Sequence, residues 1–146
     1  MSAGAAEDAE PEPAPPYDPR YLEGLARFNA ERFWDAHETL EDLWAELSGG
    51  PKRFYQGLIQ MAAAFHLVRE GEARMYGAAQ NFSDAREKFA SYPELYGGLD
   101  CAWLAERCAR CHAEALAVAR GDRETFDRAL LFTLWPGELP EKGCCG

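Results

Sequence analysis

The sequence predicts an all-α protein, an antiparallel up-and-down bundle of about five to six helices, from three observations. Apolar residues recur at steps of three and four along most of the chain, and no stretch alternates apolar and polar residues as a half-buried strand does. Helix caps and helix breakers interrupt this pattern at intervals. The connections between the predicted helices are short, and short connections favour antiparallel neighbours.

Capping signals set the limits of the individual helices. Asp18 followed by Pro19 is typical of an N-cap and the first helical position. Pro51 opens the third helix and Asp100 caps the fifth. The third helix is apolar on its flanks as well as on its main stripe, so we expect it at the centre of the bundle. The predicted helices span about 18–28, 32–47, 51–70, 73–90 and 100–120, followed by a short sixth helix that carries Phe126, Leu130 and Thr133.

The composition predicts one domain with two loose ends. The chain has 146 residues, of which 47% are hydrophobic, enough for one domain with a substantial core. Residues 1–16 are acidic and proline-rich and contain almost nothing to bury, so they are predicted to be a disordered arm. Residues 17–136 form the single helical-bundle domain, and residues 137–146 form a flexible tail that contains cysteines.

The charge excludes several classes of partner. A net charge of -10 and a pI of about 4.7, with no cluster of Lys or Arg, argue against nucleic acid and against a membrane surface. The longest apolar run, Leu58 to Val68, is interrupted by Gln60 and His66 and is shorter than the ~20 residues that span a bilayer. The N-terminus lacks the basic start and apolar centre of a secretory signal, so a cytoplasmic location is expected. Homo-oligomerisation stays open.

The stretch AHETLEDLW carries the strongest candidate for chemistry. His37-Glu38 resembles the start of a zinc-peptidase helix, but the position four residues after His37 is Glu41 rather than a histidine, which argues against that class. His37, Glu41 and Trp44 fall within about 60° of one another on a helix. An imidazole and a carboxylate one turn apart can bind a divalent metal, or the carboxylate can orient the imidazole for acid–base work. Equally, a buried histidine needs a hydrogen-bond partner, and Glu41 is the nearest.

Further polar residues occur in apolar surroundings and are predicted to support this site. If the second and third helices are antiparallel neighbours, Gln56 or Gln60 lies close to His37 and Glu41. The alternative for either glutamine is a buried amide that fixes helix register. Glu38 points about 100° away from His37, toward solvent or a neighbouring helix end. The candidate ligand-pocket residues are Asn29, Glu38, Trp44, Gln56, Gln60 and His66.

Two segments, RFNAERFWDAHETLEDLW and RFYQGLIQMAAAFHLVREGEARMYGA, resemble the domain of unknown function 309 family over about residues 27–96. The resemblance implies a small all-helical bacterial or archaeal protein whose H-x-x-x-E-x-x-W element is the functional centre. It also implies metal binding as a proposed role, without an established activity. His37, Glu41 and Trp44 all match this element.

The cysteines suggest a second, weaker thiol site. Cys108, Cys111 and His112 form the C-x-x-C-H pattern of haem attachment, but no export signal accompanies it and both cysteines lie on the inward stripe of a helix. No haem is therefore expected, and no phosphate loop or dinucleotide fingerprint indicates a nucleotide. A zinc site with Cys144 and Cys145 would need the tail to fold back, and a redox role for this adjacent pair is the alternative.

Two functions remain open on the sequence alone. In the first, the H-x-x-x-E-x-x-W element binds a small ligand or a divalent metal held by His37 and Glu41, with or without catalysis. In the second, the chain is a non-catalytic adaptor or oligomerisation module, and the His/Glu/Gln cluster is a buried polar network. The first predicts an accessible cavity with a third polar ligand, and the second predicts a sealed, hydrogen-bonded pair. Most of the aromatic residues Trp34, Trp44, Tyr55 and Tyr76 are expected in the core or between helices.

Overall fold

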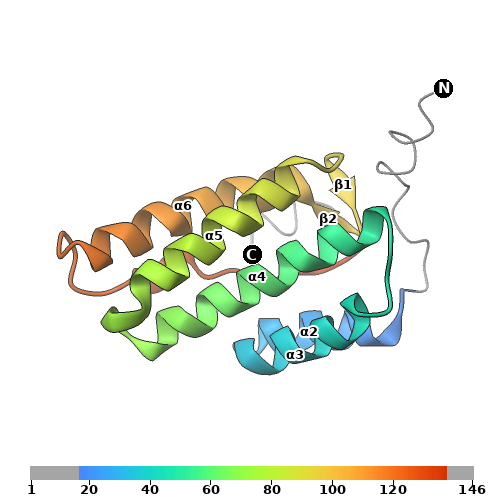
Figure 1. Ribbon diagram of the computed structural model, residues 1–146, viewed down its shortest axis with the longest axis horizontal. Coiled ribbons are helices and arrows are strands. Elements are labelled where there is room, and N and C mark those ends of the chain that lie inside the picture. Colours follow the sequence, from blue (N-terminus) through green and yellow to red (C-terminus); the bar gives the residue numbers. More distant parts are fainter. Residues whose placement is uncertain (1–16, 138–146) are drawn as a thin grey trace.

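The structure is a computed structural model that describes residues 17–137 (Figure 1). The described residues form five α-helices, two short 3-10 helices and one β-hairpin, which confirms the predicted all-α class. The α-helices are α2 (Pro19–Asn29), α3 (Phe33–Trp44), α4 (Gly50–Glu70), α5 (Met75–Ala90) and α6 (Cys101–Ala119). The short elements are η1 (Glu72–Arg74), η2 (Arg128–Leu130), β1 (Leu95–Tyr96) and β2 (Leu99–Asp100).

The predicted caps determine where several helices begin. The carboxylate of Asp18 accepts a hydrogen bond from the Arg20 backbone N–H at 2.8 Å at the start of α2. Asp100 does the same for Trp103 N–H, at 2.9 Å, at the start of α6. Each cap satisfies one of the N–H groups that a helix leaves without an internal partner. These two predicted starts are confirmed.

Each helix packs against the next one in the chain, and successive helices run in opposite directions (Figure 1). α4 lies between α3 and α5, as its apolar flanks predict, and its residues Phe54, Leu58, Met61 and Phe65 are almost completely buried. Burial of these large side chains is the main source of stability for a bundle of this size. Among the described helices, none is long and apolar enough to cross a membrane.

A small hairpin that the sequence pattern does not predict connects α5 to α6. β1 and β2 are antiparallel, with Leu95 opposite Asp100 and Tyr96 opposite Leu99. Gly97 and Gly98 form the turn with positive φ angles of 60° and 78°, which the two-residue type I′ turn requires. The hairpin is therefore fixed by its turn rather than by its length.

The predicted sixth helix is wrong. In its place, only the single turn η2 is helical, and the chain continues without regular structure as residues 131–137, which we name the strap. Phe132 is partly buried against the core and Leu134 is 3% exposed, whereas Trp135 is 53% exposed, so this segment contributes side chains to the core without forming a helix. The strap runs back along the bundle behind α4 (Figure 1). The arm predicted for residues 1–16, and the tail predicted for residues 137–146 except Gly137, lie outside the described residues.

Candidate functional site

The residues of the H-x-x-x-E-x-x-W element lie along one edge of α3, beside its buried face. Four residues of α3 face the core, namely Phe33, Ala36, Leu40 and Leu43. His37 and Trp44 are half-buried at the edge of that face, whereas Glu38 and Glu41 are exposed. The element therefore places an imidazole and an indole between the core and a strip of carboxylates.

His37 packs on Trp34 and not on Glu41. Its ring is stacked on the indole at a centroid distance of 4.5 Å and an interplanar angle of 9°. Its Nδ1 atom is buried and has no hydrogen-bond partner among the described residues. No hydrogen bond or ion pair joins His37 to Glu41 in the described part of the chain. The His–Glu pair expected from the spacing is thus not formed.

Trp44 closes the C-terminal end of α3 against α4. The Lys52 ammonium lies 3.9 Å from the centre of the indole, a cation–π contact. The same ammonium donates to the backbone carbonyls of Trp44 and Leu47 at 3.3 Å and 3.2 Å. A cation at this position compensates the partial negative charge at a helix C-terminus. Trp44 Nε1 is nevertheless buried without a hydrogen-bond partner among the described residues.

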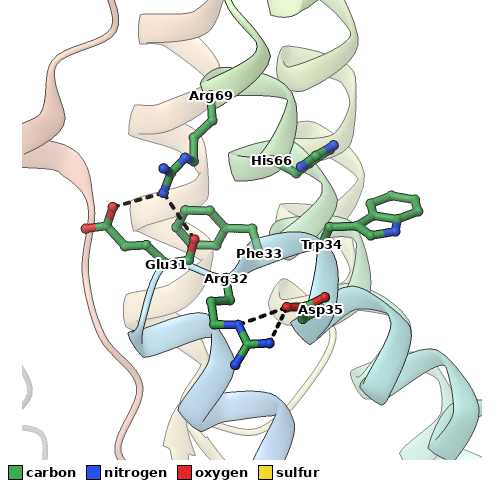
Figure 2. Close-up of a pocket in the computed structure, with 7 residues that line it drawn as sticks. All are labelled: Glu31, Arg32, Phe33, Trp34, Asp35, His66 and Arg69. Carbon is green, nitrogen blue, oxygen red and sulfur yellow. Dashed lines mark hydrogen bonds and ion pairs between the residues drawn. The ribbon is translucent and has the colours of Figure 1, made fainter.

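His66, on α4, completes the contact between the two helices. Its ring lies 5.1 Å from the Trp34 ring, tilted by 43°, and its Nε2 atom is 3.5 Å from a carboxylate oxygen of Glu70. Trp34 is therefore in contact with one imidazole from each helix, although 45% of its surface is exposed. We name Trp34, His37 and His66 the aromatic seam. Figure 2 shows the Trp34 and His66 rings pointing to the same side.

A pocket of about 210 Å³ adjoins the seam at the corner between α2 and α3 (Figure 2). We name it the corner pocket, and it is lined by Glu31, Arg32, Phe33, Trp34, Asp35, His66 and Arg69. Arg32 donates to Asp35 at 2.9 Å, and Arg69 donates to the backbone and side-chain oxygens of Glu31 at 3.1 Å and 3.3 Å. The pocket thus has paired charges along its rim, and Trp34 and His66 are among the residues that line it.

Glu31 occupies a backbone conformation that favours glycine. Its φ angle is 63°, and it is the one non-glycine residue with a positive φ among the described residues. The Arg32 and Glu31 N–H groups donate to Arg27 O and Phe28 O at 2.8 Å and 2.9 Å, the two hydrogen bonds of a Schellman motif at the end of α2. This sharp ending turns the chain directly into α3 and brings both sides of the corner pocket together.

Asn29 has a structural role that the sequence does not predict. Its amide nitrogen donates to Leu134 O at 2.8 Å, and its amide oxygen accepts from Leu134 N–H at 2.7 Å. These two bonds pair the end of α2 with the strap, as one rung of a β-ladder would. The amide that was a candidate for the site therefore holds the C-terminal segment.

The two glutamines of α4 form no hydrogen bond with His37 among the described residues. Gly57 of α4 packs against Lys88 and Phe89 of α5, since a Cβ atom there would lie 3.0–3.2 Å from them. Gln60 lies about 60° around α4 from Gly57 and about 80° from Lys52, between the sides that face α5 and α3. Gln56 lies about 40° from Lys52, nearer to α3. Among the described residues, neither glutamine is hydrogen-bonded to His37 or Glu41, and Gln60 Oε1 is buried without a partner.

The donor atoms of the element do not form a complete metal site. Within residues 17–137, no group of three or more His, Cys, Asp or Glu side chains is close enough to hold a metal ion. Protein zinc sites use three or four protein ligands. His37 and Glu41 supply at most two, so the described residues do not fit a closed metal site.

The C-x-x-C-H pattern does not form an accessible thiol site. Cys108 and Cys111 are completely buried on α6, as predicted for inward-facing residues. Burial raises the pKa of the Cys111 thiol to about 12 and raises that of Cys108 further above its ordinary value. Nδ1 of His112 is 2.9 Å from the backbone oxygen of Ala79. The partners proposed for this site, Cys144 and Cys145, lie outside the described residues.

Sequence reasoning missed the residues that make the pocket. Most of the aromatic residues were expected in the core or between helices, but Trp34 is 45% exposed and Tyr76 is 62% exposed, whereas Tyr55 is buried. Trp34 lies about 100° from Phe33 on the helix, which is a signal that it leaves the buried stripe. Glu31 and Arg69, which face each other across the corner, are 38 positions apart, and no local pattern connects them.

Comparison with known proteins finds a similarity, which covers the first part of the bundle. Residues 21–78, from the first turn of α2 to the first turn of α5, match the family model described as domain of unknown function, DUF309. This range begins and ends earlier than the expected 27–96. Among curated proteins and among solved structures, no match to the chain was found. Residues 21–78 of this chain are therefore similar to the DUF309 family.

Proposed function

We propose that this chain is a cytoplasmic protein that binds a small ligand at the aromatic seam and the corner pocket. The observation that carries this proposal is that His37 Nδ1 and Trp44 Nε1, both in the H-x-x-x-E-x-x-W element, are buried without hydrogen-bond partners among the described residues. Leaving a buried polar atom unpaired costs about 1–3 kcal/mol. Such atoms are rare in folded proteins and call for a specific explanation, such as a bound molecule or ion.

The exposure of Trp34 supports the same proposal. A large apolar side chain with 45% of its surface exposed is a poor contributor to folding. Its stacking on His37 holds the indole in one orientation beside a pocket of about 210 Å³. A rigid aromatic wall next to a few convergent polar groups is typical of small-molecule sites. The volume suits a ligand of modest size.

A divalent metal on His37 and Glu41 is a second candidate. The Glu41 carboxylate is exposed and forms no hydrogen bond or ion pair with a described residue, and it is one turn from His37. A borderline metal such as zinc accepts an imidazole and a carboxylate. With two protein ligands, such an ion would keep water or a ligand molecule in its other positions, so this candidate is a weak and open site.

The adaptor alternative predicts a different arrangement of the same residues. A buried polar network that only fixes helix register satisfies its own hydrogen bonds. The described residues show no hydrogen bond among His37, Glu41 and the two α4 glutamines. For this reason we favour ligand binding over a purely structural role for the cluster.

The test is a thermal-shift screen of the full-length protein with zinc and manganese chloride and a panel of small organic acids, amines and nucleobases. A compound that binds at the seam should raise the melting temperature of the wild type. Its affinity should fall about tenfold or more in Trp34→Ala and in His37→Ala, because each removes a contact worth about 1.4 kcal/mol or more. Glu41→Gln should abolish the effect of a metal and spare that of an organic ligand.

Matched controls come from the same chain. Trp135 is 53% exposed and His112 is half-buried, and both lie away from the corner pocket, so Trp135→Ala and His112→Ala should bind like the wild type. The proposal fails if no metal or compound stabilises the wild type. It fails equally if the seam variants and these controls lose binding to the same extent.

A further inference from the structure

The strap covers the core where a sixth helix was expected. The Phe132 ring contacts the rings of Phe28, Phe65 and Trp103 at centroid distances of 5.8, 5.5 and 5.2 Å. These partners come from α2, α4 and α6, so one side chain joins three helices. Leu134 is buried two residues further on. The strap therefore shields an aromatic surface from water.

The strap is held by separate contacts rather than by a helix or a sheet. Asn29 forms two hydrogen bonds with the backbone of Leu134, at 2.8 and 2.7 Å. Gly137 N–H donates to Gly98 O at 3.1 Å, and Arg107 donates to Leu130 O, next to the strap, at 3.2 Å. Segments with few hydrogen bonds and little regular structure open at a lower free energy than the helices beneath them.

The strap is linked to the corner pocket through a shared carboxylate. Glu31 accepts from Arg69, which lines the pocket, at 3.3 Å, and from Arg128 at 3.0 and 3.2 Å. Arg128 belongs to η2, immediately before the strap. Figure 2 shows the Arg69 side of this bridge. Moving or removing either arginine therefore changes the ion pairs of Glu31, the residue with the positive φ angle at the α2–α3 corner.

An apolar route runs parallel to this charged one. Phe33 lines the corner pocket and contacts Phe28 at 5.2 Å and Phe65 at 5.3 Å. Both of these rings contact Phe132 of the strap. Packed cores move between discrete arrangements rather than deforming smoothly. A change in the position of Phe33 at the pocket therefore alters the packing of Phe28 and Phe65 against Phe132 of the strap.

We propose that the strap is a cover latched by Asn29 that opens as a unit before the helices unfold, and that Glu31 couples its docking to the corner pocket. Arg69 and Arg128 share the Glu31 carboxylate, so a molecule in the pocket that draws Arg69 away leaves the carboxylate to Arg128, strengthens that pair and favours the docked strap. By linkage, a docked strap favours that molecule to the same degree. The coupling rests on the proposed function, whereas the latch does not.

The latch is tested by native-state amide hydrogen exchange of the full-length wild type, followed by NMR at increasing urea. The Leu134 amide should exchange through an opening with little urea dependence, because a short segment exposes little surface. The amides of Leu58 and Phe65 should exchange only through global unfolding. If the Leu134 amide shares the exchange rate and urea dependence of these core amides, the strap is part of the core and the latch is refuted.

Variants of the latch sharpen this result. Asn29→Ala removes two hydrogen bonds and should speed exchange of the Leu134 amide about tenfold or more, with core amides unchanged. Asn29→Asp keeps the acceptor and repels the Leu134 carbonyl, and it should act in the same direction. Asn81→Ala removes an exposed amide–carbonyl bond inside α5 and serves as the control. Equal effects of Asn29→Ala and Asn81→Ala on the Leu134 amide would overturn the latch.

The coupling is tested by removing one charge without touching the strap. Glu31→Gln and Arg128→Gln should each speed exchange of the Leu134 amide about two- to fivefold, the range expected for exposed ion pairs. Glu106→Gln breaks an exposed pair with Arg110 on α6 and is the matched control. If Glu31→Gln leaves the exchange of the Leu134 amide at the wild-type rate, Glu31 does not couple the pocket to the strap.

Discussion

The imidazole of His37 lies flat on the indole of Trp34, with 4.5 Å between ring centres. Side chains on a helix lean toward its N-terminus, so His37 reaches the residue three positions before it and not Glu41 four positions after it. The histidine is thereby held in one orientation by an aromatic ring that borders the corner pocket. The carboxylate that the spacing assigns to it remains exposed.

The close packing of α2 on α3 predicts that Gly24 does not tolerate a Cβ atom, and Gly77 of α5 provides the comparison. A Cβ atom at Gly24 would lie 2.6 Å from Leu40 Cγ and Cδ2, so Gly24→Ala should lower the free energy of unfolding by about 1–3 kcal/mol. At Gly77 the nearest such contact is Leu67 Cδ1 at 3.3 Å. There the same substitution should be neutral or stabilising by up to about 1 kcal/mol, because alanine favours the helix. Urea denaturation of both variants checks the opposite signs, and equal effects would contradict the packing.

Strain at the α2–α3 corner predicts an unusual order of stability at Glu31. Its positive φ costs any residue with a Cβ atom about 1 kcal/mol or more relative to glycine. Glu31→Gly and Glu31→Ala both remove the carboxylate, so Glu31→Gly should be the more stable by about that amount. Exposed Glu87 lies inside α5, where glycine should instead be less stable than alanine by about 0.5–1 kcal/mol. If urea denaturation gives the glycine and alanine variants the same order of stability at both positions, the positive φ angle of Glu31 is contradicted.

The cap of α2 predicts a contribution to acid sensitivity. The Arg20 backbone N–H, together with the Arg20 side chain, lowers the pKa of Asp18 below its ordinary value of 3.8. A carboxyl with a depressed pKa in the folded state stabilises the protein above pH ~3.8, and this contribution is lost as the pH falls through the folded value. Asparagine caps a helix without titrating. From about pH 6 to about pH 3, Asp18→Asn should therefore lose less stability in urea denaturation than the wild type. Identical losses would contradict the role of Asp18.

Burial of the α6 thiols predicts that they are inert in the folded protein. Because the thiolate is the reactive form, a Cys111 thiol whose pKa is about 12 should not react with iodoacetamide at about pH 8. Cys108 should behave in the same way. Mass spectrometry of tryptic peptides should find both residues unmodified in native protein and alkylated in urea. Rapid alkylation of either in the native protein would reopen the thiol site.

Local signals explain why most of the fold could be predicted and why the last segment could not. Asp18, Pro19 and Asp100 act on their own helices, so their effect is visible in a few neighbouring residues. The spacing of Phe126, Leu130 and Thr133 fits a helix, and Phe126 is indeed buried, but further along the chain the core contacts come from Phe132 and Leu134 of the strap. Their partners on α2 are more than 100 positions away. Tertiary packing overrode the local pattern there.

In the candidate site, too, local features could be predicted from the sequence and contacts between distant residues could not. The element with His37 and Trp44 could be found from helical spacing, because both residues lie at the edge of the buried face. The direction of the His37 ring depends on which neighbour it stacks against, and spacing does not state this. The corner pocket depends on Arg69 meeting Glu31, a contact that exists only once α4 has packed against the α2–α3 corner.

The central claim is that the aromatic seam binds a ligand, and NMR of the histidine side chains tests it most directly. Ring signals of His37, His66 and His112 would be followed in the full-length protein during titration with zinc chloride and with each compound of the small-molecule panel. At least one of the added compounds, or zinc, should shift the His37, His66 and Trp34 indole signals together and saturably. The His112 signal should not move. If every titration leaves His37 and His66 unchanged, or moves them no more than His112, the seam is not a binding site.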